Sequence, residues 1–505
     1  MGVSGVSAPI RLLADARGAF RTRFLRQLLA DAPGQIDLAL HIGDRDSDFH
    51  GACLQRLEVR IGRKGHLLHG RQGTGAQLPL LAQPDFHQLV ETAVDQMQRN
   101  AQFYRYRAHH IVNLQDYLDY YHLLANAFAQ EIQDSGATHA VFANVPHLAY
   151  DAVLYQVAQA LGLRTLILCQ TIFPSRYFSM RRIEDMGSFA DDGRAAAPFP
   201  IEKGSAPDLF YMDERWQQPS ACGQIGAKAV AQLLRHLALR DPARLFQPRY
   251  LRDTLSRMRD IYGTLPDWRD PFAQFFHTND LAYFEHLAQY EQQKLDLSQK
   301  YVYVPLHNQP EMSTSSLGGA FRDQVLMIEV LARHLPPDWL IYVKDNPRQG
   351  AFARGPMHFH RMTSIRGVRL APLAASTHEL SAHAQFVATV TGTAAWEAVR
   401  KGRPALVFGN AWYKSLPGIF PYHPDIDPLA IAAYTFPHDA LEAAMGRLMT
   451  RCHAGVIEPI YRDMAPEMDE AANAAQVSAT LRGLLVRETA LTFGQPHPGE
   501  AVALL

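Results

Sequence analysis

A strand–helix–strand pattern between residues 386 and 408 constrains the fold more than any other stretch of the chain. An apolar run forms the first strand, and the small residues Thr391, Gly392 and Thr393 turn the chain into a helix. A Lys-Gly-Arg-Pro sequence stops that helix before a second apolar strand. This βαβ unit predicts a parallel sheet, in which backbone N–H groups at a helix start can bind an anion. A tight connection without a ligand is the alternative.

Glu397 lies one helical turn beyond these small residues. Its carboxylate could accept hydrogen bonds from ribose or sugar hydroxyls. A glutamate in the first turn also complements the helix macrodipole, so a purely structural role stays open.

Two earlier strands in the same half are also followed by polar residues. The strand at 339–343 leads into Lys344, Asn346 and Pro347. Lys344 could neutralise phosphate, and the alternative is a surface lysine before a proline turn.

The strand at 301–306 is followed by a long polar loop. This loop carries His307, Gln309, Glu311, Ser313 and Thr314. A polar loop of this length is uncommon in a compact domain unless it has a function. We expect its hydroxyl and N–H groups to bind phosphate, and its histidine, glutamine and glutamate to contact a sugar.

A second βαβ unit spans residues 138–170, after expected strands at 9–14 and 35–42. His147 and Asp151 stand four residues apart where its helix begins. Such a pair could take a proton from a hydroxyl, with the aspartate orienting the imidazole. The alternative is that Asp151 caps the helix and His147 packs on it. The aromatic and basic segment that follows predicts a loop that binds an acceptor.

Length and composition limit what these units belong to. A chain of 505 residues with 47% hydrophobic residues is too long for a single core, so we expect two domains. The net charge of −1 gives no basic surface for nucleic acid. No apolar run reaches the roughly 18 residues that span a bilayer, and the first residues lack a secretion signal. The four cysteines show no metal or redox spacing, which predicts a cytoplasmic protein with reduced thiols.

The predicted fold is α/β, with two Rossmann-like domains facing a cleft and extra helices in the N-terminal half. We expect an N-terminal domain over residues 1–298 and a C-terminal domain over 299–470. A terminal helix should cross back within 471–505, followed by a flexible tail.

Three motifs, in this order, resemble the bacterial capsule polysaccharide biosynthesis family. They are a Val-Pro-Leu strand with a Gln-Pro-Glu loop, a Val-Lys-Asp-Asn-Pro element, and Thr-Gly-Thr-Ala-Ala-Trp-Glu-Ala with Gly-Arg-Pro-Ala-Leu-Val-Phe-Gly. The resemblance covers residues 301–412, with weaker support at 144–178. It implies a two-domain glycosyltransferase of the GT-B type. In that arrangement an N-terminal acceptor domain and a C-terminal nucleotide-sugar domain share a cleft, and no cofactor or metal ion is required.

The resemblance also implies roles for particular positions. In relatives that use CMP-activated acidic sugars, a His-Pro pair contacts the donor, and a Ser/Thr-rich turn binds phosphate. These positions correspond to Asn346–Pro347 and to the 391–393 turn. Because asparagine replaces histidine, CMP-Kdo and UDP-, GDP- or dTDP-sugars all remain possible donors. The base would be His147 with Asp151, or else Glu311.

The predicted function is transfer of a sugar from a nucleotide-sugar to a capsule or lipopolysaccharide glycan or glycolipid. Peripheral contact with the inner membrane is compatible with such an acceptor. A sugar-nucleotide 2-epimerase, a non-catalytic assembly subunit and a purely structural polar set are the open alternatives.

Overall fold

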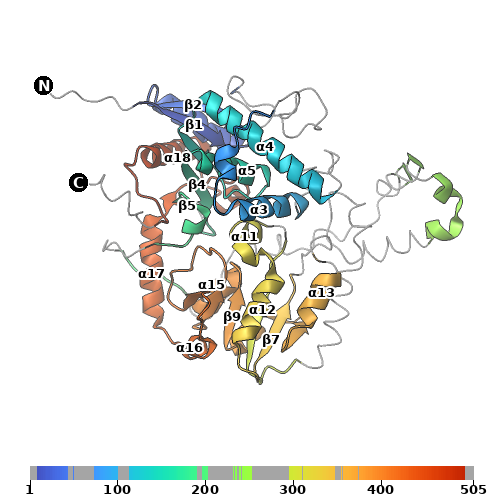
Figure 1. Cartoon of the computed structure of the whole chain (residues 1–505). Helices are drawn as coiled ribbons and strands as arrows, with labels where there is room; N and C mark the ends of the chain where they lie inside the picture. The colour runs from blue at the N-terminus through green and yellow to red at the C-terminus, as the bar shows by residue number, and fades with distance from the viewer. Residues whose placement is uncertain are drawn as a thin grey trace.

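The computed structural model describes two lobes of the chain (Figure 1). The described residues are 8–43, 49, 73–99, 113–173, 175–189, 196–202, 231, 234–235, 238–239, 242–252, 295–309, 311–346, 354, 356–372 and 375–494. The expected helical region before residue 295 lies mostly outside them.

The first lobe is built on a six-stranded sheet with the strand order β12-β5-β4-β3-β1-β2. Its strands are β1 (Ile10–Asp15), β2 (Ile36–Ile42), β3 (His139–Phe142), β4 (Arg164–Gln170), β5 (Arg176–Met180) and β12 (His453–Ala454). The pairings among β1 to β4 are parallel, and those of β5 with β4 and β12 are antiparallel. The chain moves outward from β1 in both directions, so β1 and β3 flank a topological switch point.

Helices cover both faces of this sheet. They are α1 (Ala19–Asp31), α2 (Leu78–Leu81), α3 (Phe86–Arg99), α4 (Leu114–Ser135), α5 (Tyr150–Ala160) and α18 (Glu470–Leu485). Side chains alternate along β1, so Leu12 packs with residues of α1 and α18, and Leu13 packs with residues of α3, α4 and α5. The α4 helix begins with a capping box of Asn113 and Asp116 and ends at Gly136, whose φ is 61°.

The second lobe is built on a parallel sheet with the order β11-β10-β9-β6-β7-β8. Its strands are β6 (Tyr301–Pro305), β7 (Leu340–Lys344), β8 (Val368–Ala371), β9 (Phe386–Thr389), β10 (Ala405–Val407) and β11 (Ile419–Pro421). These strands are apolar on both sides, as expected for a parallel sheet covered on two faces. The switch point of this sheet lies between β6 and β9.

The helices of the second lobe are α11 (Met312–Ser315), α12 (Gln324–His334), α13 (Pro356–Thr363), α14 (Thr377–His383), α15 (Thr393–Arg400), α16 (Pro428–Ala433) and α17 (His438–Arg451). Val302 and Val304 pack on the side of α12 and α13, whereas Tyr301 and Tyr303 face α14 and α15. The α17 helix then leads back to the first lobe, where α18 packs against α1 (Figure 1).

The predicted fold class of two Rossmann-like α/β domains is confirmed. One local prediction is wrong, because the expected acceptor loop after β4 contains the strand β5. Its residues from Tyr177 to Met180 are all buried, which an exposed loop would not be. The chain has also returned to the first sheet by β12, upstream of residue 471, where we expected the crossing to start. Among the described helices, none is long and apolar enough to cross a membrane.

Candidate active site

The predicted donor residues gather at the switch point of the second sheet. His307 follows β6, and Thr391 follows the neighbouring strand β9. Lys344 ends β7, which pairs with the other edge of β6. Ligands of open α/β sheets bind outside the carboxyl ends of the strands at such a point. The fold therefore brings residues that are far apart in sequence to the expected edge.

His307 is the centre of a buried hydrogen-bond network at this edge. Its Nε2 lies 2.8 Å from Thr389 Oγ1 and 3.4 Å from the backbone nitrogen of Thr391. Its backbone N–H donates to Gln324 Oε1 at 2.7 Å. Burial and the nearby Arg354 guanidinium lower the pKa of His307 to about 3. The imidazole is therefore neutral near pH 7 and accepts hydrogen bonds at Nε2.

The N–H groups of the small-residue turn belong to the same network. Gly392 N–H donates to Thr389 Oγ1 at 3.3 Å, and Thr391 N–H donates to His307 Nε2 at 3.4 Å. The Thr391 hydroxyl donates to the carbonyl of Ser313 at 2.7 Å. The sequence predicts that these amides face an anion, whereas in this structure they are bonded to side chains of the protein.

Gly392 is required here by close packing rather than by its backbone angle. A Cβ at this position would lie 2.8 Å from Thr389 Oγ1 and 3.1 Å from His307 Cε1. Its φ of −68° is accessible to any residue. The histidine can therefore approach the turn only because the residue has no side chain.

The polar loop after β6 is held by its own side chains. Glu311 Oε2 accepts from the Ser313 hydroxyl at 3.3 Å, and the Glu311 carbonyl accepts from the Thr314 hydroxyl at 3.3 Å. Gln309 Nε2 donates to the carbonyl of Arg322 at 2.7 Å. Thr314 is fully buried, whereas Glu311 is exposed. Of the predicted loop residues, Glu311 is therefore the one whose side chain is most accessible to a ligand.

Lys344, Thr393 and Glu397 lie on the side of the sheet that faces α14 and α15. Lys344 Nζ donates to Thr377 Oγ1 at 3.0 Å, and the charge of Glu397 acts on the nearby hydroxyl of Tyr303. Glu397 is hydrogen-bonded to Thr393, and burial raises the pKa of its carboxyl. Lys344 and Glu397 are each only 9% exposed. The structure therefore brings these residues into one region near Tyr303, with Lys344 and Glu397 buried and Thr393 partly exposed.

A buried ion pair in this lobe was not predicted from the sequence. Arg354 pairs with Asp345, and its guanidinium also donates to the carbonyl of His307. Both side chains are 2% exposed or less. Asn346 N–H donates to Asp345 Oδ1 at 2.7 Å, while Pro347 lies outside the described residues. Arg354 lies in a stretch without apolar periodicity, so the sequence gives no signal for the pairing.

In the first lobe, Asp151 accepts backbone N–H groups of the loop before α5 and does not orient the imidazole. Its Oδ1 accepts from Leu148 N–H at 2.6 Å, and its Oδ2 accepts from the backbone N–H of His147 at 3.1 Å. The imidazole Nδ1 instead lies 2.6 Å from the carbonyl of Val145. The predicted contact between Asp151 and the imidazole is therefore wrong. The alternative of a capping aspartate is wrong as well, because the N-cap of α5 is Ala149 and no side chain caps this helix. The catalytic role of the two residues stays a prediction.

Other charged residues lie near this pair at the switch point of the first sheet. Asp15 ends β1, and Arg21 in α1 forms an ion pair with Glu458. The charges of Glu458 and Arg21 both act on His147. The sequence could have indicated Asp15, because it directly follows a predicted strand. It gave no signal for Glu458, which comes from the far end of the chain.

A hydrogen-bonded contact joins the two switch-point edges. Gln96 is 1% exposed, and its Nε2 donates to Ser315 O at 3.0 Å and to Ser316 Oγ at 3.1 Å. Its Oε1 accepts from Ala149 N–H at 3.3 Å. Ser316 Oγ also donates to the carbonyl of Pro146. The loop after β3 and the loop after β6 therefore meet, and the carboxyl edges of the two sheets face each other.

An aromatic contact joins the lobes at a second place. Trp412 lies 5.3 Å from Trp396 of α15, between ring centroids, and 5.5 Å from Phe173 of the first lobe. Phe178 of β5 is stacked at 6.3 Å from the same tryptophan. The aromatic residues that we expected to bind an acceptor thus pack between the lobes.

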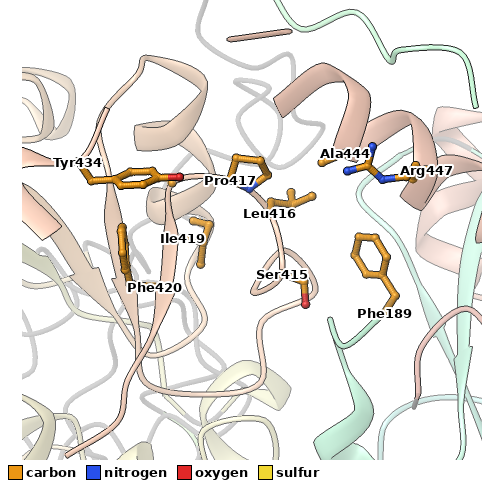
Figure 2. A pocket seen from close by; sticks show the side chains of 10 residues that line it. Phe189, Ser415, Leu416, Pro417, Ile419, Phe420, Tyr434, Ala444 and Arg447 are labelled. Carbon is orange, nitrogen blue, oxygen red and sulfur yellow. The ribbon is translucent and has the colours of Figure 1, made fainter. Parts of the chain in front are cut away.

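A pocket of about 400 Å³ opens near β11 and α17 (Figure 2). Its described lining residues are Phe189, Ser415, Leu416, Pro417, Gly418, Ile419, Phe420, Tyr434, Ala444 and Arg447. They come from the first lobe, the segment around β11 and α17. None of them is a predicted site residue, so this pocket is separate from the two switch-point edges.

The second-lobe motifs match a known family. Residues 281–421 match the model described as capsule polysaccharide biosynthesis protein. The predicted resemblance is confirmed over this segment. This segment, residues 281–421, is called the capsule-family segment below. It contains all the predicted donor residues, from His307 to Glu397, and the switch point between β6 and β9.

A comparison with solved structures gives matches at low similarity. The β-Kdo 2,7-transferase KpsC of Thermosulfurimonas dismutans aligns at 12% identity over 63% of this chain and 78% of that chain, with a TM-score of 0.27. The UDP-GlcNAc 2-epimerase of Methanocaldococcus jannaschii aligns at 11% identity over 87% of this chain and 99% of that chain, with a TM-score of 0.23. No curated protein sequence was found to match the chain.

Proposed function

We propose that this protein is a glycosyltransferase that moves a sugar from a nucleotide-sugar to a capsule or lipopolysaccharide type of glycan. The donor would bind at the edge of the second sheet, and the acceptor would bind at the edge of the first. In this proposal the protein works in the cytoplasm, and a glycolipid acceptor would be presented at the inner membrane.

The observation that carries the proposal is the meeting of two switch-point edges within a chain that contains a capsule-family segment. Ser315 and Ser316 of the donor loop contact Gln96 and Pro146 at the other edge, and Gln96 in turn accepts from Ala149 N–H. Two substrates bound at these edges would lie next to each other. Holding two reactants in this way is the main requirement of a group transfer.

The turn at the start of α15 can exchange its present partners for a donor phosphate. The N–H···acceptor distances from Thr391 and Gly392 are 3.4 and 3.3 Å, which is longer than the usual distance of about 2.9 Å. Hydrogen bonds to a charged phosphate oxygen are shorter and stronger than such neutral bonds. Binding of a phosphate would therefore replace weak contacts with strong ones, and it would also use the helix dipole.

Lys344 is our choice for the positive charge that stabilises the departing nucleotide. Lys344 pairs with Pro305 of β6, and β6 also pairs with β9. The ends of β7 and β9 are therefore two strand spacings apart, or about 10 Å, a distance that an extended lysine side chain and a phosphate bound between them can span together. A lysine and a helix N-terminus can stabilise the leaving group without a metal ion.

Donor binding can be tested with the whole chain and a panel of CMP-Kdo and UDP-, GDP- and dTDP-sugars. A ligand present at one hundred times its Kd stabilises the folded protein by about 2.7 kcal/mol, which a thermal shift detects. We expect one nucleotide class to bind and Lys344→Ala to weaken that binding at least tenfold. Lys401→Ala is the matched control, because this lysine contacts His378 on α14 and does not end a strand. Failure of every nucleotide-sugar to bind would refute the proposal.

The same panel separates the alternatives. A transferase should release free nucleotide faster when an acceptor such as an octyl glycoside is added. A 2-epimerase should convert its nucleotide-sugar without acceptor and release little nucleotide. A non-catalytic assembly subunit should bind no nucleotide-sugar.

A further inference from the structure

The first sheet has a half-buried carboxylate at its own switch point. Asp15 is the last residue of β1, and its carbonyl accepts from Ala143 N–H at 3.1 Å, directly after β3. Its Oδ1 accepts a hydrogen bond from the Tyr150 hydroxyl at 3.2 Å. Ligands bind in open sheets at this position, between β1 and β3. Asp15 is therefore located where a substrate of the first lobe would lie.

A strained turn holds the partners of this carboxylate. Ala149 has φ 70° and ψ −60°, and Tyr150 N–H donates to Leu148 O at 2.9 Å. Together these describe a γ-turn of the rare and strained kind. A non-glycine residue in such a conformation is strained, and strain of this kind is common at functional sites. The strain fixes the start of α5, and with it Tyr150 beside Asp15.

Titratable groups of the neighbouring elements act on Asp15. They are Asp151 and Tyr150 of α5, and Arg17 and Arg21 after β1. Arg21 also pairs with Glu458, and the charges of both act on His147. On the β2 side, His41 Nε2 lies 3.0 Å from the Ala16 carbonyl. Burial and the Asp151 charge raise the pKa of Asp15 to about 7, although Arg17, Arg21 and the Tyr150 hydroxyl act in the opposite direction. A base with a pKa near the working pH is the most effective in proton transfer.

The neighbouring candidates are less suited to take a proton. Both oxygens of Asp151 accept backbone N–H groups, and this residue is only 4% exposed. The imidazole of His147 has its Nδ1 bonded to the Val145 carbonyl, and burial lowers its pKa. Asp15 is more exposed than Asp151 and has a second carboxylate oxygen beyond the one bonded to Tyr150.

We propose that Asp15 is the catalytic base that takes the proton of the acceptor hydroxyl, and that Tyr150 and Arg17 position it. This inference rests on the proposed glycosyl transfer. The acceptor O–H bond breaks, and its proton moves to a carboxylate oxygen of Asp15. The acceptor oxygen forms a bond with the anomeric carbon. The bond from that carbon to the donor phosphate breaks, and its electron pair leaves with the nucleotide.

Arg17 and Tyr150 hold the base through a shared contact. The Arg17 guanidinium lies 5.6 Å from the centroid of the Tyr150 ring, and it also bonds the hydroxyl. A positive charge and a hydroxyl donor near Asp15 both favour its ionised form. Removing either of them should make the carboxylate harder to ionise.

The test measures nucleotide-sugar binding and transfer to an octyl glycoside for the whole chain, with Asp15→Asn, Tyr150→Phe and Asp37→Asn. Asp37→Asn is the matched control, because this aspartate is exposed on β2. We expect Asp15→Asn to bind the nucleotide-sugar within about twofold of the unmodified protein and to lose at least 100-fold in transfer. Tyr150→Phe should move the acidic limb of kcat/KM to higher pH, which a merely structural role would not do.

The outcomes separate the assignment of Asp15 as the base from the proposed glycosyl transfer. If Asp15→Asn still transfers at a rate within tenfold, Asp15 is not the base and the glycosyltransferase proposal stands. An unmoved pH limb in Tyr150→Phe would likewise overturn the base assignment. If the unmodified chain binds no nucleotide-sugar, the proposed function fails and the assignment of the base fails with it.

Discussion

The two lobes have their polar residues at equivalent places but with different chemistry. At the switch point of the first sheet the side chains are ionisable, including Asp15, His147 and the Arg21–Glu458 pair. At the switch point of the second sheet, His307 and Thr389 form a neutral network. The charges beside this network, on Lys344 and on the Arg354–Asp345 pair, are buried and bonded within the protein. One topology therefore presents two kinds of surface.

This difference fits the two halves of a transfer reaction. Proton transfer needs a group that changes its charge near the working pH. Binding a donor phosphate needs preorganised N–H groups and a fixed positive charge, and a titrating group offers no advantage there. Substitutions at the two switch points test this difference, and the largest effect is expected where a buried charge loses its partner.

The largest effect is expected for Arg354 and Asp345. Among the described residues, they form the one ion pair that is buried at the edge of the second sheet. Arg354→Leu would leave Asp345 charged without a partner and would remove a donor from the His307 carbonyl. Loss of one partner of a buried pair costs about 3–5 kcal/mol. The free energy of unfolding from urea denaturation should fall by about this amount.

Two further variants show whether this cost comes from the unpaired charge. Adding Asp345→Asn to Arg354→Leu should restore much of the loss, because no buried charge would then remain. Arg361→Leu is the control, since this half-exposed arginine bonds Asp323 and Glu329 at the surface. It should cost less than about 1 kcal/mol. Equal losses for the two arginines would contradict the distinction.

The next effect is steric and tests how tightly the neutral edge is packed. Gly392→Ala would place a methyl group 2.8 Å from Thr389 Oγ1 and 3.1 Å from His307 Cε1. Overpacking of this kind costs about 1–3 kcal/mol, and it should also weaken nucleotide-sugar binding. Gly402→Ala is the control, because it lies after the other end of α15 with φ +77° and nothing within 4 Å. It should lower stability through backbone strain and leave nucleotide-sugar affinity unchanged.

Asp15→Asn should make the protein more stable at alkaline pH even though it removes the proposed base. The pKa of Asp15 is raised to about 7, above an unfolded value of 3.8. Between about pH 4 and pH 7, the folded state therefore holds a proton that the unfolded chain has released. The stability that Asp15 contributes is fully present below about pH 4 and is lost as the pH rises through 7. A rise in pKa from 3.8 to about 7 corresponds to about 4 kcal/mol when no solvent screens the group. Because Asp15 is partly exposed, we expect the stability of the unmodified chain relative to Asp15→Asn to fall by about 1–2 kcal/mol between pH 4 and pH 8. Thermal denaturation of both proteins across this pH range measures the difference in their stability. A difference that does not change with pH would contradict the raised pKa of Asp15.

The sequence predicted the framework better than the contacts. Apolar runs and turn residues indicated both βαβ units, because strand burial and helix stops are local properties of the chain. The pairing of Arg354 with Asp345 and the approach of Glu458 to His147 depend on how distant elements pack. The segment around Tyr177 was misread as a loop because its polar and aromatic mixture hides the burial on both faces. Residue type indicated that Asp151 mattered, but only the fold showed that it receives backbone N–H groups.

The smallest effect is expected at Glu397, and it tests whether the edge of the second sheet uses any titrating carboxylate. This side chain is 9% exposed and bonded to Thr393, and burial raises its pKa, so its charge is disfavoured where it lies. Glu397→Gln keeps the shape of the side chain and a hydrogen-bonding atom for the threonine. The free energy of unfolding should change by less than about 0.5 kcal/mol. If the residue only supports the turn, calorimetric titration should give a nucleotide Kd within about twofold of the unmodified chain. A loss of tenfold or more, about 1.4 kcal/mol, would instead support the predicted ribose contact and mean that the carboxylate becomes accessible when the nucleotide binds.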